Sequence, residues 1–303
     1  MKRKIIKQAG QAYTVTLPID WVRAFALDKK QEIDVEQKGN QLILSAKQSA
    51  KGETVTIDVA NLSKRSIYQT IHALYARGVD EIRVTSHKNV APLLRDAVLQ
   101  MISFAVFEEK NACVLKEMGT SSSEQGQLDD LYKQVWQLVL QYYRTVIDDV
   151  CGPLVATKED IFSRDHEINK FCLHLQRLIS KQTYTNQQQG QIYAQYAFLL
   201  EILSDDINRI WRFSVEQKRT VKPLRKLFEE SLASLQDAFH ISYNLDHDRI
   251  DHLRKRRDTV RTLALSFTQT HQIRIAHYAL NIAERSCDLM HLAIMWRFKS
   301  ETK

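Results

Sequence analysis

Turn-forming residues are scarce in this chain of 303 residues, which has eight glycines and four prolines. Globular chains on average use about 12% of these two residue types together, whereas here they occupy 12 of 303 positions. A chain with so few places to turn must run in long regular elements, and long elements are mostly helices. The sequence therefore predicts a mainly α-helical protein and argues against a β-sandwich or a disulfide-rich scaffold.

The longest helical pattern follows a serine-rich linker at residues 120–126. Beyond it, over residues 127–298, apolar side chains such as Leu131, Val135 and Leu138 recur at steps of three or four. Breaks in this pattern divide the region into expected helices at 128–150, 159–181, 190–217, 223–243, 248–269 and 272–298. Short connections between long amphipathic helices favour antiparallel packing in a bundle.

The first segment, residues 1–47, predicts a small β-rich unit. Alternating apolar and polar residues predict strands at 4–7, 13–17, 31–36 and 41–45, with a hairpin turn at 38–40. Pro18 ends the second strand, and Asp20 is placed to cap a short helix that ends near Phe25. A unit of this size is marginal alone. Because it has no disulfide or metal motif, we expect a second copy of the chain to complete it.

Positive charge is concentrated in the same segment. Residues 1–52 carry 10 Lys or Arg against 5 Asp or Glu, residues 53–119 carry 8 against 8, and residues 120–303 carry 25 against 23. A basic module suits a polyanion, with nucleic acid as the first candidate, and a solubilising tail is the alternative. The expected contacts to a phosphate backbone are Lys2, Arg3, Lys4, Lys7 and Arg23.

A second small unit is predicted at residues 53–119. Its pattern predicts strands at 54–59, 81–85, 104–108 and 112–116, with helices at 63–76 and 89–101. Ser63 is placed to cap the first helix, and Gly78 lies just beyond its end. The segment has no glycine-rich phosphate loop and no acid–base constellation. We therefore expect this α/β unit to serve as a spacer or a dimerisation module.

Pairs of acids occur at matching places on the third and sixth predicted helices. Glu201 precedes Asp205 by four residues, and Glu284 precedes Asp288 by four. The separations also agree, since Asn169 lies 32 residues before Glu201 and Asp251 lies 33 before Glu284. An internal duplication, three helices plus three, explains both agreements.

Acids four residues apart share a helix face and repel each other, so a cation is expected beside them. A metal ion is one candidate, because carboxylates and imidazoles bind hard and borderline metals. The main candidate ligands are Glu201, Asp205, Glu284 and Asp288, and weaker candidates are Asp165, Asn169, His247, Asp251, His277 and His291. The alternative is a salt-bridged face that uses Arg209, Arg285 or the basic run at 249–261.

The N-terminal segment resembles the AbrB/SpoVT/MazE-like swapped-hairpin domain. The resemblance lies in Gly10 through Val35, above all in the run Leu17-Pro18-Ile19-Asp20-Trp21-Val22-Arg23. It implies that two chains exchange hairpins to form one β-barrel that binds DNA, and hence an obligate homodimer. Arg23 stands where that family often has a DNA-contacting arginine. The preceding residue, often basic in DNA-binding members, is Val22 here.

The helical region resembles the PhoU family of phosphate-signalling regulators. The resemblance lies in the duplicated helices, in Asp165-His166-Glu167-Ile168-Asn169 and in the two Glu-x-x-x-Asp pairs. It implies a pair of three-helix bundles. Some members of that family carry iron or other metal clusters on such motifs. Asp165 matches the motif, Asn169 stands where an acid is common, and His247 with Asp251 occupies the equivalent turn of the second repeat. The three segments together resemble archaeal-type PhoU regulators.

The expected fold is thus mainly α, with an N-terminal swapped-hairpin barrel half (1–47), a small α/β unit (53–119) and a PhoU-like pair of three-helix bundles (127–298). The expected function is a phosphate-responsive transcriptional regulator that is not an enzyme and binds DNA as a homodimer. The alternative is an adaptor that docks on a phosphate transporter or signalling protein through the helical bundle without binding DNA. A di-metal enzyme is disfavoured because no Glu-x-x-His motif lies on the helices with the acid pairs.

Cysteine usage and hydropathy predict a cytoplasmic location. The four cysteines, at 113, 151, 172 and 287, share no metal or redox spacing, and the N-terminus lacks an apolar block of signal-peptide length. We expect no membrane span, because no apolar stretch approaches the length needed to cross a bilayer.

Overall fold

The computed structural model describes residues 3–8, 12–30, 32–38, 41–45, 53–119, 125–181, 187–216 and 221–297. They belong to two compact units, residues 1–52 and residues 53–303. The predicted α/β unit and the predicted helical region both lie in the second unit, although each has its own hydrophobic core. Residues 120–124 of the predicted linker lie outside the described residues.

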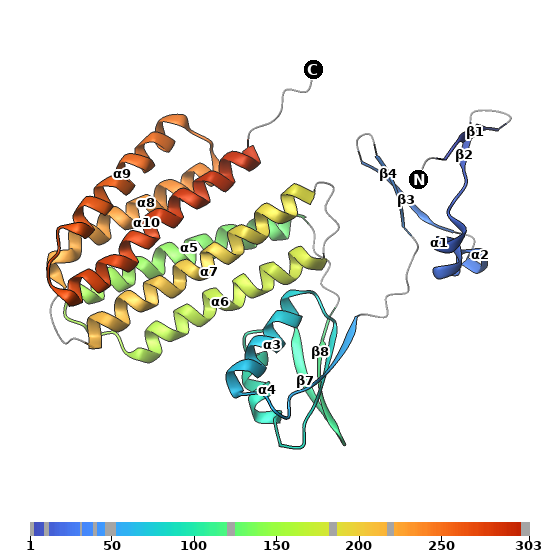
Figure 1. The fold of residues 1–303 in the computed structure, drawn as a ribbon, viewed down its shortest axis with the longest axis horizontal. Helices are drawn as coiled ribbons and strands as arrows, with labels where there is room; N and C mark the ends of the chain where they lie inside the picture. The colour runs from blue at the N-terminus through green and yellow to red at the C-terminus, as the bar shows by residue number, and fades with distance from the viewer. Residues whose placement is uncertain are drawn as a thin grey trace. The chain divides into compact units, whose positions relative to one another are not determined.

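The N-terminal unit consists of two hairpins separated by two short helices (Figure 1). Its elements are β1 (Ile5–Lys7), β2 (Tyr13–Val15), α1 (Ile19–Ala24), α2 (Leu27–Lys30), β3 (Asp34–Lys38) and β4 (Gln41–Ser45). β1 pairs with β2 and β3 with β4, both antiparallel, as separate two-stranded sheets. The predicted strands are present with shifted ends. Residues 9–11 and 39–40, where turns were predicted, lie outside the described residues.

The helical part of this unit differs from the prediction in two ways. Pro18 rather than Asp20 occupies the N-cap of α1, and no side chain caps that helix end. Asp20 therefore lies within the first turn, where its charge favours the helix dipole. The helix α2 was not expected. It follows Ala26, whose φ of 48° lies outside the helical region and so separates α2 from α1.

The second unit begins with a four-stranded sheet covered by two helices. Its elements are β5 (Thr54–Asp58), α3 (Lys64–Ala76), β6 (Glu81–Thr85), α4 (Ala91–Val98), β7 (Phe104–Glu109) and β8 (Ala112–Glu117). The strand order is β5-β6-β8-β7, with β5 parallel to β6 and the other neighbours antiparallel. Ile71, Tyr75 and Ile82 are fully buried in the core of this domain.

Helix ends in this domain follow the predicted capping. The Ser63 hydroxyl accepts a hydrogen bond from the Ser66 N–H at 3.2 Å, and Gly78, with φ of 98°, turns the chain after α3. Helix α4 is shorter than the predicted 89–101, because the Asn89 carboxamide oxygen accepts from the Ala91 N–H at 3.1 Å and so places the helix start at Ala91.

Six long helices form the rest of the described chain. They are α5 (Gln125–Val150), α6 (Lys158–Lys181), α7 (Gln187–Glu216), α8 (Arg225–Tyr243), α9 (His247–Leu265) and α10 (Thr270–Arg297), with a short 3₁₀ turn η1 (Lys222–Leu224) before α8. All six were predicted from apolar spacing, and their ends agree within a few residues. Together with the small β region and the α/β domain they confirm the mainly α fold.

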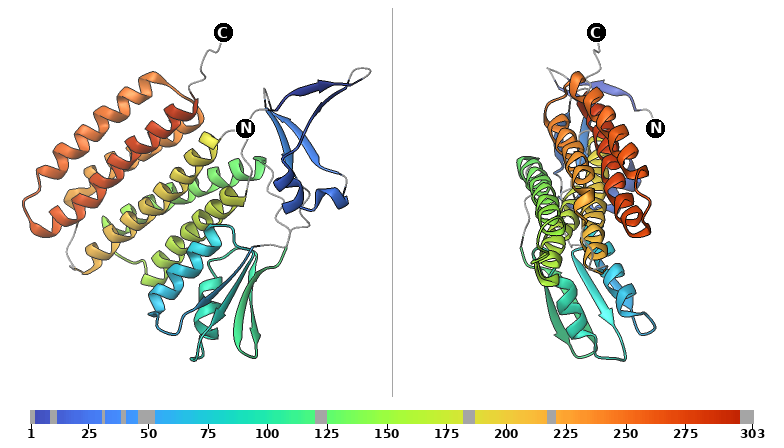
Figure 2. Two further views of the ribbon diagram at one scale, coloured as in Figure 1. Left: turned by 45° about the vertical axis from the view of Figure 1, so that its right-hand side comes forward. Right: turned by 90° about the vertical axis from the view of Figure 1, so that its left-hand side faces the viewer.

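The helices pack as two sets of three, α5–α7 and α8–α10, which run alternately up and down (Figure 2). Helix α7 packs against α10 and α5 against α8, so that the two sets share one continuous core. Trp136, Tyr143 and Phe228 are fully buried there. Among the described residues, none of these helices is long and apolar enough to span a bilayer.

The α/β domain is fastened to the bundle by Arg177 of α6, whose side chain is only 1% exposed. Its guanidinium donates to the carbonyl oxygens of Tyr75 and Val79 at 3.0 and 2.8 Å and to the Glu117 carboxylate at 2.7 Å. The Tyr75 carbonyl lies in the last turn of α3 and the Val79 carbonyl in the turn that follows it, so a bundle residue caps a helix of the α/β domain. The guanidinium also lies over the rings of Tyr75 and Phe104.

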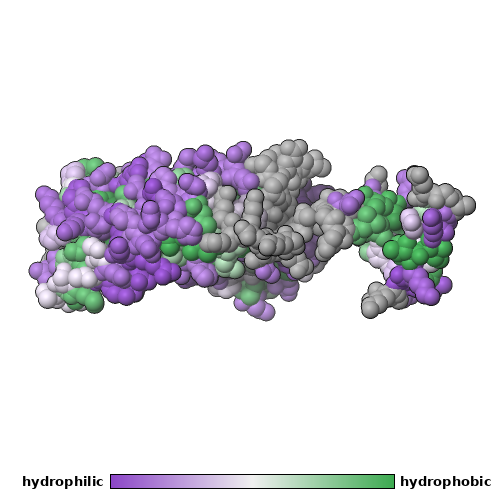
Figure 3. Space-filling view, turned by 90° about the horizontal axis from the view of Figure 1, so that it is seen from above, coloured by the Kyte–Doolittle hydropathy of each residue, from purple (hydrophilic) through white to green (hydrophobic). Residues whose placement is uncertain are grey.

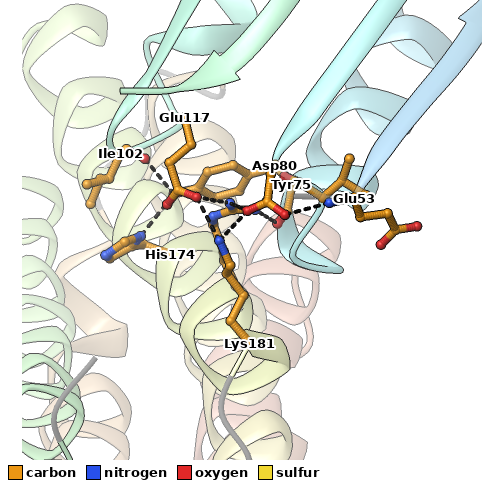
Figure 4. A network of polar contacts seen from close by, with 9 residues as sticks. Glu53, Tyr75, Asp80, Ile102, Glu117, His174 and Lys181 are labelled. Carbon is orange, nitrogen blue, oxygen red and sulfur yellow. Dashed lines mark hydrogen bonds and ion pairs between the residues drawn. The ribbon is translucent and has the colours of Figure 1, made fainter. Parts of the chain in front are cut away.

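Two further residues of α6 extend this joint (Figure 4). Lys181 donates to the Glu117 carboxylate at 2.7 Å and forms an ion pair with Asp80. The Nδ1 atom of His174 lies 2.9 Å from the Tyr75 hydroxyl, and burial lowers the pKa of His174 to about 4. The contact between domain and bundle is therefore centred on a buried arginine and flanked by partly exposed ion pairs.

Candidate functional site

The predicted DNA-contacting cations lie on the surface of the N-terminal unit. Arg3 and Lys4 precede β1, Lys7 ends it, and Arg23 occupies the last turn of α1, all with exposed side chains. Lys2 lies outside the described residues. None of the four described side chains is buried, so each can approach a phosphate backbone.

Apolar side chains of the same unit also face outward (Figure 3). Among the described side chains of this unit, Leu27 alone is buried. Ile5 is 71% exposed and Leu42 is 61% exposed, and further exposed apolar residues are Ile6, Tyr13, Val15, Ile19 and Val35. So many exposed apolar side chains in about 50 residues mark an interaction surface rather than a finished core.

A group of carboxyls lies between α6 and α7. Asp165 of α6 is buried and accepts a hydrogen bond from the Ser204 hydroxyl of α7 at 2.6 Å. Burial raises the pKa of Asp165, and the negative charge of Asp205 adds to the effect. Burial likewise raises the pKa of Glu201, again with contributions from Asp205 and Asp165. The structure thus brings together three of the acids that the sequence proposed as ligands.

Arginines neutralise part of this group. Asp205 forms an ion pair with Arg209 at 2.7 Å. The next residue, Asp206, is 1% exposed and pairs with Arg209 at 2.8 Å and with Arg285 of α10. Asp206 therefore ties the two sets of helices together. Asp206 was not predicted as a site residue, because its counterpart in the second repeat is Leu289 and no spacing rule singles it out.

The second acid pair has a similar environment on α10. Glu284 forms an ion pair with Arg261 of α9. Burial raises the pKa of Asp288, and Glu284 adds to that shift, while Arg285 and His291 oppose it. The salt-bridged face that the sequence left as an alternative to metal is thus present at Asp205 and at Glu284.

Of the weaker candidates on α9 and α10, His291 lies near Asp288. His247, Asp251, His277 and His291 are exposed, and the Asn281 carboxamide nitrogen lies 3.3 Å from Nε2 of His277. Asn169 of α6 has a buried carboxamide oxygen without a hydrogen-bond partner. Among the described residues, no three His, Cys, Asp or Glu side chains lie close enough to hold a metal ion.

The basic run on α9 is largely committed to neighbouring acids. Arg256 pairs with Glu230 at 2.7 Å and with Asp237 at 3.2 Å. Arg249 reaches Asp237 at 3.3 Å, and Arg257 and Arg261 also have carboxylate partners. The cations of this run thus offset acidic neighbours, as the salt-bridged alternative predicts.

A cleft of about 1340 Å³ lies where the α/β domain meets the first half of α6. Tyr68, Leu99 and Gln100 line it from the domain, and Arg164 and Lys170 line it from α6. The cleft was not predicted from the sequence, because its walls come from segments far apart in the chain that only the tertiary structure brings together.

Comparison with protein-family models gives a match in the N-terminal unit. The family model described as "Antidote-toxin recognition MazE, bacterial antitoxin" matches residues 6–52. The match ends where the first compact unit ends, at Gly52, so the similarity concerns that unit. No curated protein and no solved structure matches the chain.

Proposed function

We propose that the chain is a DNA-binding transcriptional regulator that acts as a homodimer in the cytoplasm, by binding rather than by catalysis. The observation that carries the proposal is the N-terminal unit, which exposes basic and apolar side chains together and is similar to MazE over residues 6–52. The apolar side chains are available to a second copy, and the basic ones to DNA phosphates.

The helical bundle is the proposed sensor of phosphate status. The duplicated helices with their acid pairs support this part of the proposal, as does their resemblance to PhoU. The cleft beside α6 offers a place for a small effector, since the cations Arg164 and Lys170 and the aromatic side chains Tyr68 and Phe171 line it, together with three acids.

A partner-binding adaptor is the second candidate. Val22 favours it, because this position offers no positive charge to DNA beside Arg23. Such an adaptor would use the bundle to dock on a transporter or signalling protein. An antidote that recognises a toxin, as the matched family is described, would equally be a partner-binding protein.

The salt dependence of DNA binding tests the proposal. Removing one phosphate contact should lower the slope of log affinity against log salt by about 0.9. Replacing Lys4, Lys7 and Arg23 together with Ala should therefore flatten the slope and weaken binding. The control with the same reduction of charge replaces Lys64, Arg65 and Lys88, which are exposed on the second unit, and it should bind as the wild type does. No DNA affinity of the wild type at low salt would select the adaptor instead.

Iron or another transition metal at the acid pairs stays a prediction of the sequence. Bound metal would stabilise the folded chain by mass action, by about 2.7 kcal/mol at a hundredfold excess over the dissociation constant. The melting temperature should then rise with Fe²⁺ or Mn²⁺ and fall on chelation. Changing Glu201, Asp205, Glu284 and Asp288 to amides should remove that response. An unchanged melting temperature of the wild type would leave the acids with a structural role.

A further inference from the structure

The strand β5 forms an edge of the four-stranded sheet and has β6 as its one strand neighbour among the described residues. Hydrogen bonds to β6 show which way its backbone points. The Val59 N–H donates to the Thr85 carbonyl at 3.0 Å, and the Glu53 carbonyl accepts from the Glu81 N–H at 3.1 Å. Because backbone groups alternate along a strand, those of Thr54, Thr56 and Asp58 point away from β6.

Side chains of β5 are also less covered than those of its neighbour. Val55 and Ile57 lie opposite Ile82 and Val84 in the register and share their helix-facing side. Ile82 and Val84 are buried, whereas Val55 and Ile57 remain partly exposed. The edge therefore presents both a row of backbone groups and half-covered apolar side chains.

The opposite edge of the sheet is protected. Its strand β7 ends in Glu108 and Glu109, which form ion pairs with Arg95 and Arg83. Charged side chains are a common device against pairing with another chain. β5 has the sequence Thr-Val-Thr-Ile-Asp, with a single charge at its end and no proline. Only one of the two edges is thus suited to add a strand.

We propose that two copies of the chain pair through their β5 strands, antiparallel and centred on Thr56. In this register Thr56 faces its own copy and Thr54 faces Asp58, so the outward backbone groups of all three residues meet as hydrogen-bonded pairs. Val55 faces Ile57 of the other copy on the helix side. No like charges meet, and the Thr54 hydroxyl lies opposite the Asp58 carboxylate. The two sheets become one continuous sheet.

A short strand pair of this kind is weak alone, and the N-terminal unit supplies what it lacks. That unit ends at Gly52, and β5 begins at Thr54. When two N-terminal units associate, the two β5 strands are held on short tethers, and a short tether gives an effective concentration in the millimolar range. The second contact would fix the two 53–303 units relative to each other.

Cysteine cross-linking in the full chain tests the register. Paired Cα atoms in the expected geometry lie about 5.5 Å apart, within the range for a disulfide. Thr56→Cys should therefore give a reducible covalent dimer on mild oxidation. Thr54→Cys should not exceed the wild type, because residue 54 and its copy would lie about 13 Å apart. The double variant Thr54→Cys with Asp58→Cys should cross-link again. The wild type controls for Cys113 and Cys287, which are partly exposed.

Hydrogen exchange gives a second measurement without cysteines. The outward backbone amide of residue 56 should exchange slowly in the wild-type dimer. It should exchange quickly in the Thr56→Lys variant, because that change places two positive charges opposite each other. A Thr56→Cys variant that cross-links no more than the wild type, or no more than Thr54→Cys, would overturn the proposal. So would fast exchange of the Thr56 amide in the wild type. The strand pairing rests on the proposed homodimer, but neither readout depends on DNA binding, so DNA binding and strand pairing can fail separately.

Discussion

The two units of this protein differ in where they put their apolar and charged side chains. In residues 1–52 most described apolar side chains face outward, and Leu27 alone is buried. In residues 53–303 apolar side chains form two cores, and even a charged residue, Arg177, is fully enclosed and hydrogen-bonded. The second unit is therefore a finished fold, whereas the first needs a partner to bury the apolar side chains that it exposes.

The largest expected effect is loss of the dimer that the N-terminal units are expected to form. Leu42→Asp places a charge on an apolar residue that we expect to be buried between two N-terminal units, so the dimer should dissociate. Light scattering and the change of melting temperature on dilution would measure this. The matched control is Leu265→Asp in the second unit, where the leucine is 78% exposed. A wild type that is monomeric and equally stable at all concentrations would contradict the prediction.

The next largest effect concerns the second unit, at the contact between the α/β domain and the bundle. Arg177→Ala removes a buried donor, although the Glu117 carboxylate keeps Lys181 and the Tyr75 carbonyl keeps the Gly78 N–H. Leaving a buried acceptor such as the Val79 carbonyl without its donor typically costs about 1–3 kcal/mol. Urea unfolding should show this destabilisation, with the α/β domain unfolding before the bundle. Arg65→Ala, at an exposed arginine of α3, should change stability by less than about 0.5 kcal/mol. Equal effects of the two changes would mean that the joint does not hold the domain.

A smaller effect concerns the acids inside the bundle. Burial raises the pKa of Glu201, so the folded state holds this proton more tightly than the unfolded chain does. The stabilising contribution of Glu201 is then greatest below its ordinary pKa and is lost as pH rises through the raised value. Glu201→Gln should remove that pH dependence and stabilise the protein at neutral pH. Urea unfolding between about pH 4.5 and 7.5, in steps of about half a pH unit, would measure this pH dependence of the free energy of unfolding.

The control for this measurement is Glu167→Gln, at an exposed carboxyl on α6. It should leave the pH dependence of stability as it is in the wild type. A Glu201→Gln variant that is less stable than the wild type at neutral pH would show that the ionised carboxylate has a cationic partner in solution, and a metal ion would then be the first candidate.

The smallest effect compares helix caps in the two units. Ser63 caps α3 through its hydroxyl, whereas Asp20 makes no cap bond in α1. Ser63→Ala should lower the free energy of unfolding by about 1 kcal/mol. Asp20→Ala should cost less, because it removes only a favourable charge near the helix start. Thermal melting of both variants beside the wild type would rank them, and the reverse ranking would show that Asp20 caps α1 in the dimer.

Local patterns in the sequence predicted the elements well. Apolar spacing located all six bundle helices, and Ser63 with Gly78 located the ends of α3. Where local chemistry was ambiguous, the prediction failed. Pro18 rather than Asp20 is the N-cap of α1. Helix α2 follows a positive φ at Ala26, and alanine gives no sequence signal for that backbone conformation. The acid pairs were found by their repeat, yet their spacing could not tell a metal from an arginine, since both satisfy two neighbouring carboxylates.

By itself the sequence determined the mainly helical fold, the basic N-terminal unit and the duplicated acids, because periodicity, composition and charge act over a few turns of chain. Tertiary structure decided which charges meet. Arg177 reaches the end of α3 about a hundred residues away, and Arg285 reaches Asp206 across the helix sets. Such pairs depend on how packed helices are rotated and placed, and no spacing along the chain encodes that.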